Sequence, residues 1–273
     1  MPLNALFSLA SGDGPLVATA VHDGHRLRQN LQLHIALSEA DRLREEDPFT
    51  GTLTAVAPTR IVGLHSRFEV DLNRPRDGAV YRTPEDAWGL QVWDAEPPDA
   101  VVEESLARYD AFYACVRGVL EEKVARHGGF VLYDVHSYNH RRDGPDAAPD
   151  DPEANPEVNV GTGSVRGARW RPVVEAFMGT LAGQTVGGLN AEPHRLDVRE
   201  NVKFKGGHFP TWVNETFGDH GCALAIEFRK DFMDEWTGRG DPVHLRALIE
   251  ALRATVAPVL EALEQVRPAV AAR

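Results

Sequence analysis

Three short apolar segments predict buried strands. They cover residues 16–21, 130–135 and 222–228, and the only charged residues inside them are Asp134 and Glu227. The segment 130–135 is apolar on both faces except at Asp134, as an interior strand of a parallel sheet would be.

Two further segments predict strands by shorter patterns. Residues 61–64 form a brief apolar run. In residues 68–72 three apolar side chains alternate with two acidic ones, which predicts a half-exposed strand or a sheet edge.

A long helix is predicted over residues 99–127. Asp99 stands where it can cap the first turn, and Gly128-Gly129 ends the pattern. Apolar residues at helical spacing form a stripe that belongs in the core. The stripe consists of Tyr109, Phe112, Tyr113, Val116, Val119, Leu120 and Val124.

Three other helices are predicted. Residues 27–37 form one, residues 166–183 form a second with Ser164 as its cap, and the last begins at Asp241-Pro242. Pro258 lies inside the last helix, so we expect a kink or a break there.

Residues 143–163 show no hydrophobic periodicity and contain four prolines and three glycines. We expect a long loop, and loops of this length are usually functional or disordered. Elsewhere strands and helices alternate along the chain without an internal repeat. This order predicts a single α/β domain over residues 1–273 with a mixed, largely parallel sheet.

Composition narrows the class of partner. A formal net charge of −12 argues against nucleic acid and against an anionic membrane surface, but a few arginines can still reverse the field around an acidic substrate. Cys115 and Cys222 lack CxxC partners, which suits reduced, buried thiols. The chain shows neither a signal peptide nor a membrane span, so we expect a cytoplasmic protein; its oligomeric state is not predicted.

Three predicted strands carry an ionisable side chain at or beside their carboxyl end. These are His22, His136 and Glu227. Ligands of open α/β sheets bind outside those ends, so we expect the three side chains to converge. Two imidazoles and one carboxylate suit a catalytic zinc ion, which leaves a fourth position for water.

The third ligand is expected to be an acid from elsewhere in the fold. Glu45, Glu46 and Asp47 form the cluster that supplies it.

Two polar segments are candidates for substrate binding. In residues 66–74, Arg67 offers a planar fork for a carboxylate and Asn73 adds an amide. The alternative is a structural Arg67–Asp71 ion pair. In residues 201–208, paired glycines predict first a tight turn and second a loop that approaches a ligand closely.

These segments resemble the N-formylglutamate amidohydrolase family. Residues 66–74 look like its SR-x-x-x-DLNR signature, and residues 134–137 look like its strand end with the pattern D-hydrophobic-HS. Residues 201–207 resemble its Asn-x-x-x-(Lys/Arg)-Gly-Gly loop, and residues 226–227 resemble its late strand glutamate. Residues 21–24 occupy the place of its first histidine turn.

The resemblance implies a three-layer α/β/α fold, similar to the zinc carboxypeptidases and of the phosphorylase/hydrolase-like type. It also implies one Zn²⁺ per chain, or another divalent metal, held by His22, Asp47 and His136. Asp47 is preferred for its Asp-Pro context, and Glu45 and Glu46 are the alternatives.

The resemblance further assigns Glu227 as general base and Arg67 as the group that polarises the scissile carbonyl. The substrate-binding residues it implies are Asn73, Arg74, Asn201, Lys205 and Gly206. The implied activity is hydrolysis of N-formyl-L-glutamate or a similar small acidic N-acyl amino acid, in amino-acid catabolism and histidine degradation.

Two alternatives stay open. One is a broader N-acyl-amino-acid deacylase or carboxypeptidase-like enzyme, which shares the chemistry and differs in the pocket. The other is a metal- or ligand-binding module that has lost turnover.

Overall fold

The computed structural model describes residues 5–189 and 191–267. Its centre is a seven-stranded sheet with the strand order β1-β3-β2-β4-β9-β5-β8. The strands are β1 (Phe7–Ala10), β2 (Leu16–Ala20), β3 (Thr59–Gly63), β4 (Phe130–Tyr138), β5 (Val158–Gly161), β8 (Val198–Glu200) and β9 (Gly221–Arg229). A separate two-stranded sheet pairs β6 (Thr185–Val186) with β7 (His194–Arg195).

The sheet is mixed but mostly parallel. The pairs β2–β3, β2–β4, β4–β9 and β5–β8 are parallel, whereas β1–β3 and β5–β9 are antiparallel. The carboxyl ends of β2, β4 and β9 therefore lie at the same edge of the sheet.

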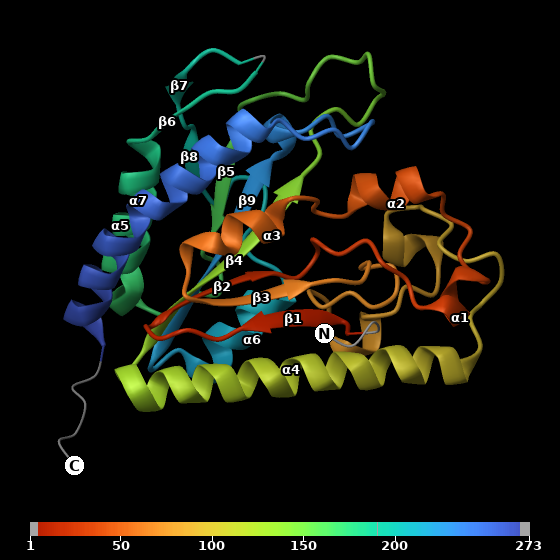
Figure 1. The fold of residues 1–273 in the computed structure, drawn as a ribbon, viewed down its shortest axis with the longest axis horizontal. Helices are drawn as coiled ribbons and strands as arrows, with labels where there is room; N and C mark the ends of the chain where they lie inside the picture. The colour runs from red at the N-terminus through yellow and green to blue at the C-terminus, as the bar shows by residue number, and fades with distance from the viewer. Residues whose placement is uncertain (1–4, 190, 268–273) are drawn as a thin grey trace.

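Helices cover both faces of the sheet (Figure 1). The long helix α4 and helix α6 lie on one face, and α3, α5 and α7 lie on the other. The helices are α1 (Gln29–Gln32), α2 (Glu39–Glu45), α3 (Thr50–Leu53), α4 (Asp99–His127), α5 (Arg171–Ala182), α6 (His208–Phe217) and α7 (Pro242–Val266). This confirms the three-layer α/β/α fold.

Strand β4 shows why the layers form. Val131, Tyr133 and Val135 point into the core shared with α5 and α7, whereas Phe130 and Leu132 point into the core beneath α4. Burying an apolar side chain of this size stabilises the fold by roughly 1.5–3 kcal/mol. A strand that is apolar on both faces is therefore most stable between two helix layers.

The two longest helices follow the sequence prediction closely. Helix α4 spans Asp99–His127 and ends at Gly128 with φ +73°, but Pro98, not the Asp99 side chain, stands at its cap position. The Asp241 carboxylate caps α7 by accepting hydrogen bonds from the backbone of Val243 and His244. Helix α7 continues through Pro258 as one element, so the expected break does not occur.

Two predictions near the N-terminus are wrong. Residues 27–37 contain only the four-residue helix α1, because the chain then turns to pair Ile35 with Trp93 in a short bridge. Residues 68–72 form no strand: Glu69 and Asp71 are buried completely, and their carboxylates accept hydrogen bonds from distant groups. The alternating pattern reflects buried polar contacts that a sequence window does not contain.

Two boundaries also differ from expectation. Strand β5 lies at the end of the predicted 143–163 loop. Helix α5 begins at Arg171 after a helical turn over Ala168–Trp170, and the Ser164 hydroxyl accepts a hydrogen bond from Asn214 instead of capping it.

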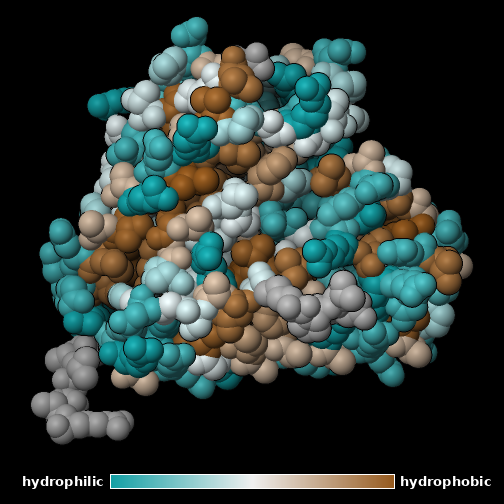
Figure 2. Space-filling view, viewed as in Figure 1, coloured by the Kyte–Doolittle hydropathy of each residue, from teal (hydrophilic) through white to brown (hydrophobic). Residues whose placement is uncertain are grey.

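The visible face is polar along its upper and right edges (Figure 2), and one of the two thiols is buried as predicted. The face seen in Figure 2 is mostly hydrophilic at its upper and right edges, and hydrophobic residues show in separate groups nearer its centre. Cys222 is buried, Cys115 is half-buried, and both are free thiols. No helix formed by residues 5–189 and 191–267 has the length and apolarity to span a membrane.

Asn214 on α6 extends the pairing of β9 where β5 ends. Its amide accepts from the Ala223 N–H at 2.8 Å and donates to the Ala223 carbonyl at 3.0 Å. We expect Asn214→Ala to lower the free energy of unfolding by about 1–3 kcal/mol, because two buried backbone groups lose their partner. Urea denaturation measures this change. The exposed Asn30→Ala control should stay within about 0.5 kcal/mol of wild type, and equal effects would contradict the assignment.

Candidate metal centre

The carboxyl ends of β2, β4 and β9 bring together the three side chains predicted to converge. His22 follows β2 by two residues, and His136 lies in β4. Glu227 in β9 is the direct parallel partner of His136, so the two side chains leave the same face of the sheet.

Asp47 joins the two imidazoles. Its Oδ2 lies 2.9 Å from His136 Nδ1 and 3.4 Å from His22 Nδ1, and the ring centroids are 4.9 Å apart. The three side chains are almost fully buried, and one ligand atom from each lies within 4.8 Å of the others. Within the described part of the chain, no other three histidine, cysteine or carboxylate side chains gather in this way.

The three acidic candidates for the third ligand, Glu45, Glu46 and Asp47, point to different places. The Asp47 N–H donates to the His22 carbonyl at 3.0 Å, which fixes the aspartate beside that ring. Glu46 points away: its carboxylate accepts from the Ser66 hydroxyl and lies 2.5 Å from His25 Nδ1. Glu45 lines the cavity beside the centre but is not part of the His–Asp–His cluster.

A carboxylate holds the far nitrogen of each imidazole. His22 Nε2 lies 2.7 Å from Asp71 Oδ1, and His136 Nε2 lies 2.9 Å from Asp134 Oδ2. The Thr19 hydroxyl donates to the other Asp134 oxygen at 2.8 Å. Carboxylates in this position fix the tautomer and leave Nδ1 free to bind a metal, so the donor set fits a divalent cation. Sequence reasoning missed this role, although the spacing of Asp134 and His136 places both on one face of a strand.

Arg67 takes part in a structural ion pair and also lines the cavity. Its guanidinium donates to Asp71 Oδ2 at 2.7 Å and to the Tyr81 hydroxyl at 3.2 Å, and Tyr81 in turn donates to Asp71. The ion pair that the sequence offered as an alternative is therefore present. The Trp88 ring covers the guanidinium at 4.8 Å. Neither Tyr81 nor Trp88 stood out in the sequence.

The charged groups of the centre change one another's pKa values, and those of Asp47 and Asp71 are lowered. Burial opposes ionisation of Asp47, but hydrogen bonds from His136 and His22 hold the pKa of Asp47 well below its usual value. Burial likewise opposes ionisation of Asp71, but the Arg67 charge, together with His22 and the Tyr81 hydroxyl, holds the pKa of Asp71 well below its usual value. Both carboxylates are anionic at neutral pH.

The pKa values of His136 and Glu227 are raised, not lowered. Burial favours the neutral His136 ring, but the Asp134 charge and the hydrogen bonds to Asp134 and Asp47 together raise the pKa of His136 above its usual value. Burial raises the pKa of Glu227 to about 7, against the opposing charge of His136.

A cavity of about 680 Å³ opens over the cluster. Of the predicted substrate-binding residues, Asn73, Arg74, Lys205 and Gly206 line it. The Asn73 amide oxygen accepts from the Phe209 N–H at 2.8 Å and so holds the glycine loop before α6.

Asn201 does not line this cavity. It adopts a left-handed φ of 55°, and its side chain bonds Thr162, accepting from the N–H at 2.9 Å and donating to the hydroxyl at 2.8 Å. Its position in the glycine segment therefore suits a residue that shapes the loop.

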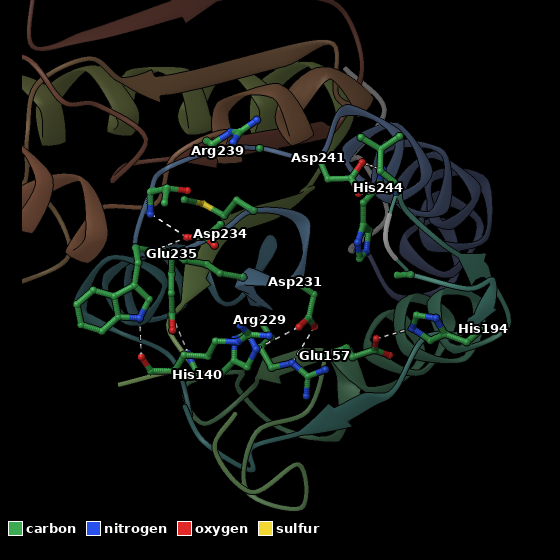
Figure 3. Close-up of a pocket in the computed structure, with 18 residues that line it drawn as sticks. His140, Glu157, His194, Arg229, Asp231, Asp234, Glu235, Arg239, Asp241 and His244 are labelled. Carbon is green, nitrogen blue, oxygen red and sulfur yellow. Dashed lines mark hydrogen bonds and ion pairs between the residues drawn. The ribbon is translucent and has the colours of Figure 1, made fainter. Parts of the chain in front are cut away.

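A second cavity of about 700 Å³ lies near the same edge (Figure 3). His140, Asp231 and His244 are among the residues that line it. The His22–Asp47–His136 cluster does not line this cavity.

The fold and the site together define an α/β protein with a buried His–Asp–His cluster at the carboxyl ends of its strands. The N-formylglutamate amidohydrolase family model matches residues 14–233. The chain therefore belongs to the N-formylglutamate amidohydrolase family, a family of hydrolases.

Solved structures agree with this fold. The crystal structure of an N-formylglutamate amidohydrolase from Ralstonia eutropha JMP134 is similar over 97% of this chain and 100% of its own, with 20% identity and a TM-score of 0.71. The gene product Atu2144 from Agrobacterium tumefaciens is similar over 94% of this chain and 96% of its own, with 17% identity and a TM-score of 0.62. At these identities the likeness shows a shared fold. A search of curated proteins found no match.

The carboxylate behind His136 gives the first prediction for the centre. We expect Asp134→Asn to weaken the affinity for added Zn²⁺, used as a probe of the cluster, by ~10–100-fold, because the amide orients the ring poorly and lowers its basicity. Competition with a chelator of known affinity measures the change. The exposed Asp110→Asn serves as control, since Asp110 pairs with Arg76 at the surface. Unchanged zinc affinity in Asp134→Asn would remove Asp134 from this role.

Proposed function

We propose that this chain is a zinc-dependent amidohydrolase that cleaves N-formyl-L-glutamate, or a similar small acidic N-acyl amino acid, to the acid and the free amino acid. The observation that carries the proposal is the buried cluster of His22, Asp47 and His136 beside Glu227. Membership of the amidohydrolase family supports the reaction type. We also propose that the protein acts in the cytoplasm.

The donor set supports one divalent ion per chain, with Zn²⁺ as the proposed metal. His22 and His136 would offer Nδ1, and Asp47 would offer a carboxylate oxygen. A bound zinc ion supplies Lewis acidity and makes water a nucleophile near neutral pH.

Glu227 is the proposed general base. Its side chain is partly buried and leaves the sheet beside His136, within the lining of the cavity. In the proposed reaction Glu227 takes a proton from the attacking water and then gives it to the departing amine nitrogen.

Arg67 and the neighbouring cations are proposed to bind the negatively charged groups of the substrate. The Arg67 guanidinium is held by Asp71 and would donate to the carbonyl oxygen as negative charge develops there. Arg74 and Asn73 would hold a substrate carboxylate, and Lys205 with the Gly206 backbone would contact the substrate from the other side. Asn201 would position that loop by its contacts with Thr162.

A broader N-acyl-amino-acid deacylase is the second candidate. Trp88 is half-exposed, lines the cavity and stacks on Arg67, so the rim offers an aromatic surface as well as charge. Such a surface would accept an apolar acyl or side-chain group.

One experiment tests the function and separates the candidates. Metal content of the purified protein is determined by elemental analysis and coupled to assays on N-formylglutamate, N-acetylglutamate, N-formylmethionine and dipeptides. We expect about one zinc per chain and fastest release of formate from N-formylglutamate. Comparable rates on several acyl amino acids would support the broader deacylase. Bound zinc without hydrolysis of any substrate would support a binding module.

Replacing the proposed base should separate chemistry from metal binding. We expect Glu227→Gln to keep one zinc per chain and to lower kcat by ~10²–10⁴, because the amide cannot accept the proton. Steady-state kinetics and elemental analysis measure the two effects. Near-normal kcat would exclude Glu227 as the base.

Arg74 should affect substrate binding more than metal binding. We expect Arg74→Ala to raise KM for N-formylglutamate by ~10–100-fold, the effect of losing a hydrogen bond to a charged group. The matched control is Arg76→Ala, since Arg76 pairs with Asp110 at the surface. If both variants keep the wild-type KM, Arg74 does not hold the carboxylate.

A further inference from the structure

Lys230 is a buried cation without an ion pair among the described residues. It is 2% exposed, and no carboxylate oxygen of those residues lies within 4.0 Å of its ammonium. The Nζ group instead donates to the carbonyl oxygens of Arg44 at 2.6 Å and Glu46 at 2.8 Å. Burial lowers the pKa of Lys230 to about 8, so the side chain is still mostly protonated at pH 7. A buried ammonium is costly unless its hydrogen bonds are satisfied, so these two contacts hold the lysine in place.

One end of this contact is the helix that leads to Asp47. Helix α2 ends at Glu45, and Glu46 is its C-cap. The last carbonyls of a helix have no partner within it and form the negative end of its dipole. The Lys230 ammonium satisfies two of them directly before Asp47.

The other end of the contact is the strand that carries Glu227. Strand β9 ends at Arg229, and Lys230 follows it immediately. Glu227 stands three residues earlier on the same strand. One ammonium group therefore connects the backbone before the acidic ligand with the strand of the base.

We infer that Lys230 is a positioning residue that fixes Asp47 relative to His136 and Glu227. The inference rests on the proposed function, because it takes Asp47 as a metal ligand. Lys230 does not bind the metal in this scheme; it acts through the carbonyls of Arg44 and Glu46.

Lys230 also lies between two cavities and lines both of them. It lines the cavity above the cluster and also the second cavity, which Asp231 and His140 line as well (Figure 3). The side chain is thus part of the wall between them. A shorter side chain would let water from the second cavity reach the backbone beside Asp47.

The chain offers a matched control in Lys123. This lysine is also fully buried and donates to a backbone carbonyl, that of Gly12 at 2.6 Å. Gly12 precedes β2, so this contact lies at the amino ends of the strands, opposite the candidate centre. Loss of either ammonium removes a buried hydrogen bond, but only Lys230 is tied to the Asp47 segment.

The experiment compares Lys230→Met and Lys123→Met in the full chain. The zinc dissociation constant is measured by chelator competition, and kcat and KM are measured with saturating zinc. For Lys230→Met we expect zinc binding weaker by ~10–100-fold and a lower kcat, with KM changed by less than about threefold, because Lys230 does not hold the substrate carboxylate. For Lys123→Met we expect zinc affinity and kcat within about threefold of wild type. Denaturation of both variants records the loss of stability separately.

The outcomes separate this inference from the proposed function. A wild-type chain that binds no zinc contradicts the proposed function. If wild type binds zinc and the two lysine variants bind it equally well, the role of Lys230 is overturned. Should Lys230→Met fail to fold, Lys230→Gln keeps amide donors but loses the charge and the reach, and is expected to weaken zinc binding by at least ~10-fold. Zinc binding by Lys230→Gln equal to that of Lys123→Met would overturn the inference as well.

Discussion

Negative charge buried at one edge of the sheet is the constraint on which the rest of the site depends. Asp47, Asp71 and Asp134 are buried, Glu227 is partly buried, and the Arg67 guanidinium pairs with Asp71. Charges removed from water are costly unless they are paired and hydrogen-bonded. The two imidazoles share protons with three of these carboxylates, which lowers the cost but leaves an excess of negative charge. A divalent cation between His22, Asp47 and His136 would supply the missing positive charge.

Backbone hydrogen bonds hold the acidic residues of the site in position. The Asp47 N–H binds the His22 carbonyl, and the Asn73 N–H binds Asp71 Oδ1 at 2.8 Å. The first bond fixes the backbone of Asp47 beside His22, and the second holds the Asp71 carboxylate in one orientation. The parallel β2–β4–β9 arrangement is what makes this possible, because three strand ends deliver side chains to the same place.

The sequence predicted the parts of the structure that local pattern decides. Strand β4 and helix α4 are stretches in which hydrophobic periodicity, capping glycine and burial agree. His22 and His136 were predicted to converge because a side chain at a strand end has a predictable location, whereas Asp47 was preferred only through the family resemblance. Glu69 and Asp71 show the limit of this approach. Their carboxylates bind groups far away in sequence, so the segment has the pattern of a half-exposed strand or sheet edge but forms a buried turn. The role of Lys230 could not be predicted from the sequence either, because its partners are backbone carbonyls 184 and 186 residues earlier in the chain.

Two regions of opposite charge lie close together in the proposed site. The inner cluster is acidic, whereas the cavity above it is lined by Arg74, Arg142, Lys203 and Lys205 in a chain of net charge −12. Cations on a concave rim attract an anionic substrate from solution, but bare carboxylates below them would repel the same substrate at short range. A divalent cation held by His22, Asp47 and His136 would remove that repulsion. In the proposed reaction a dianionic substrate would therefore bind better to the metal-loaded protein than to the metal-free protein.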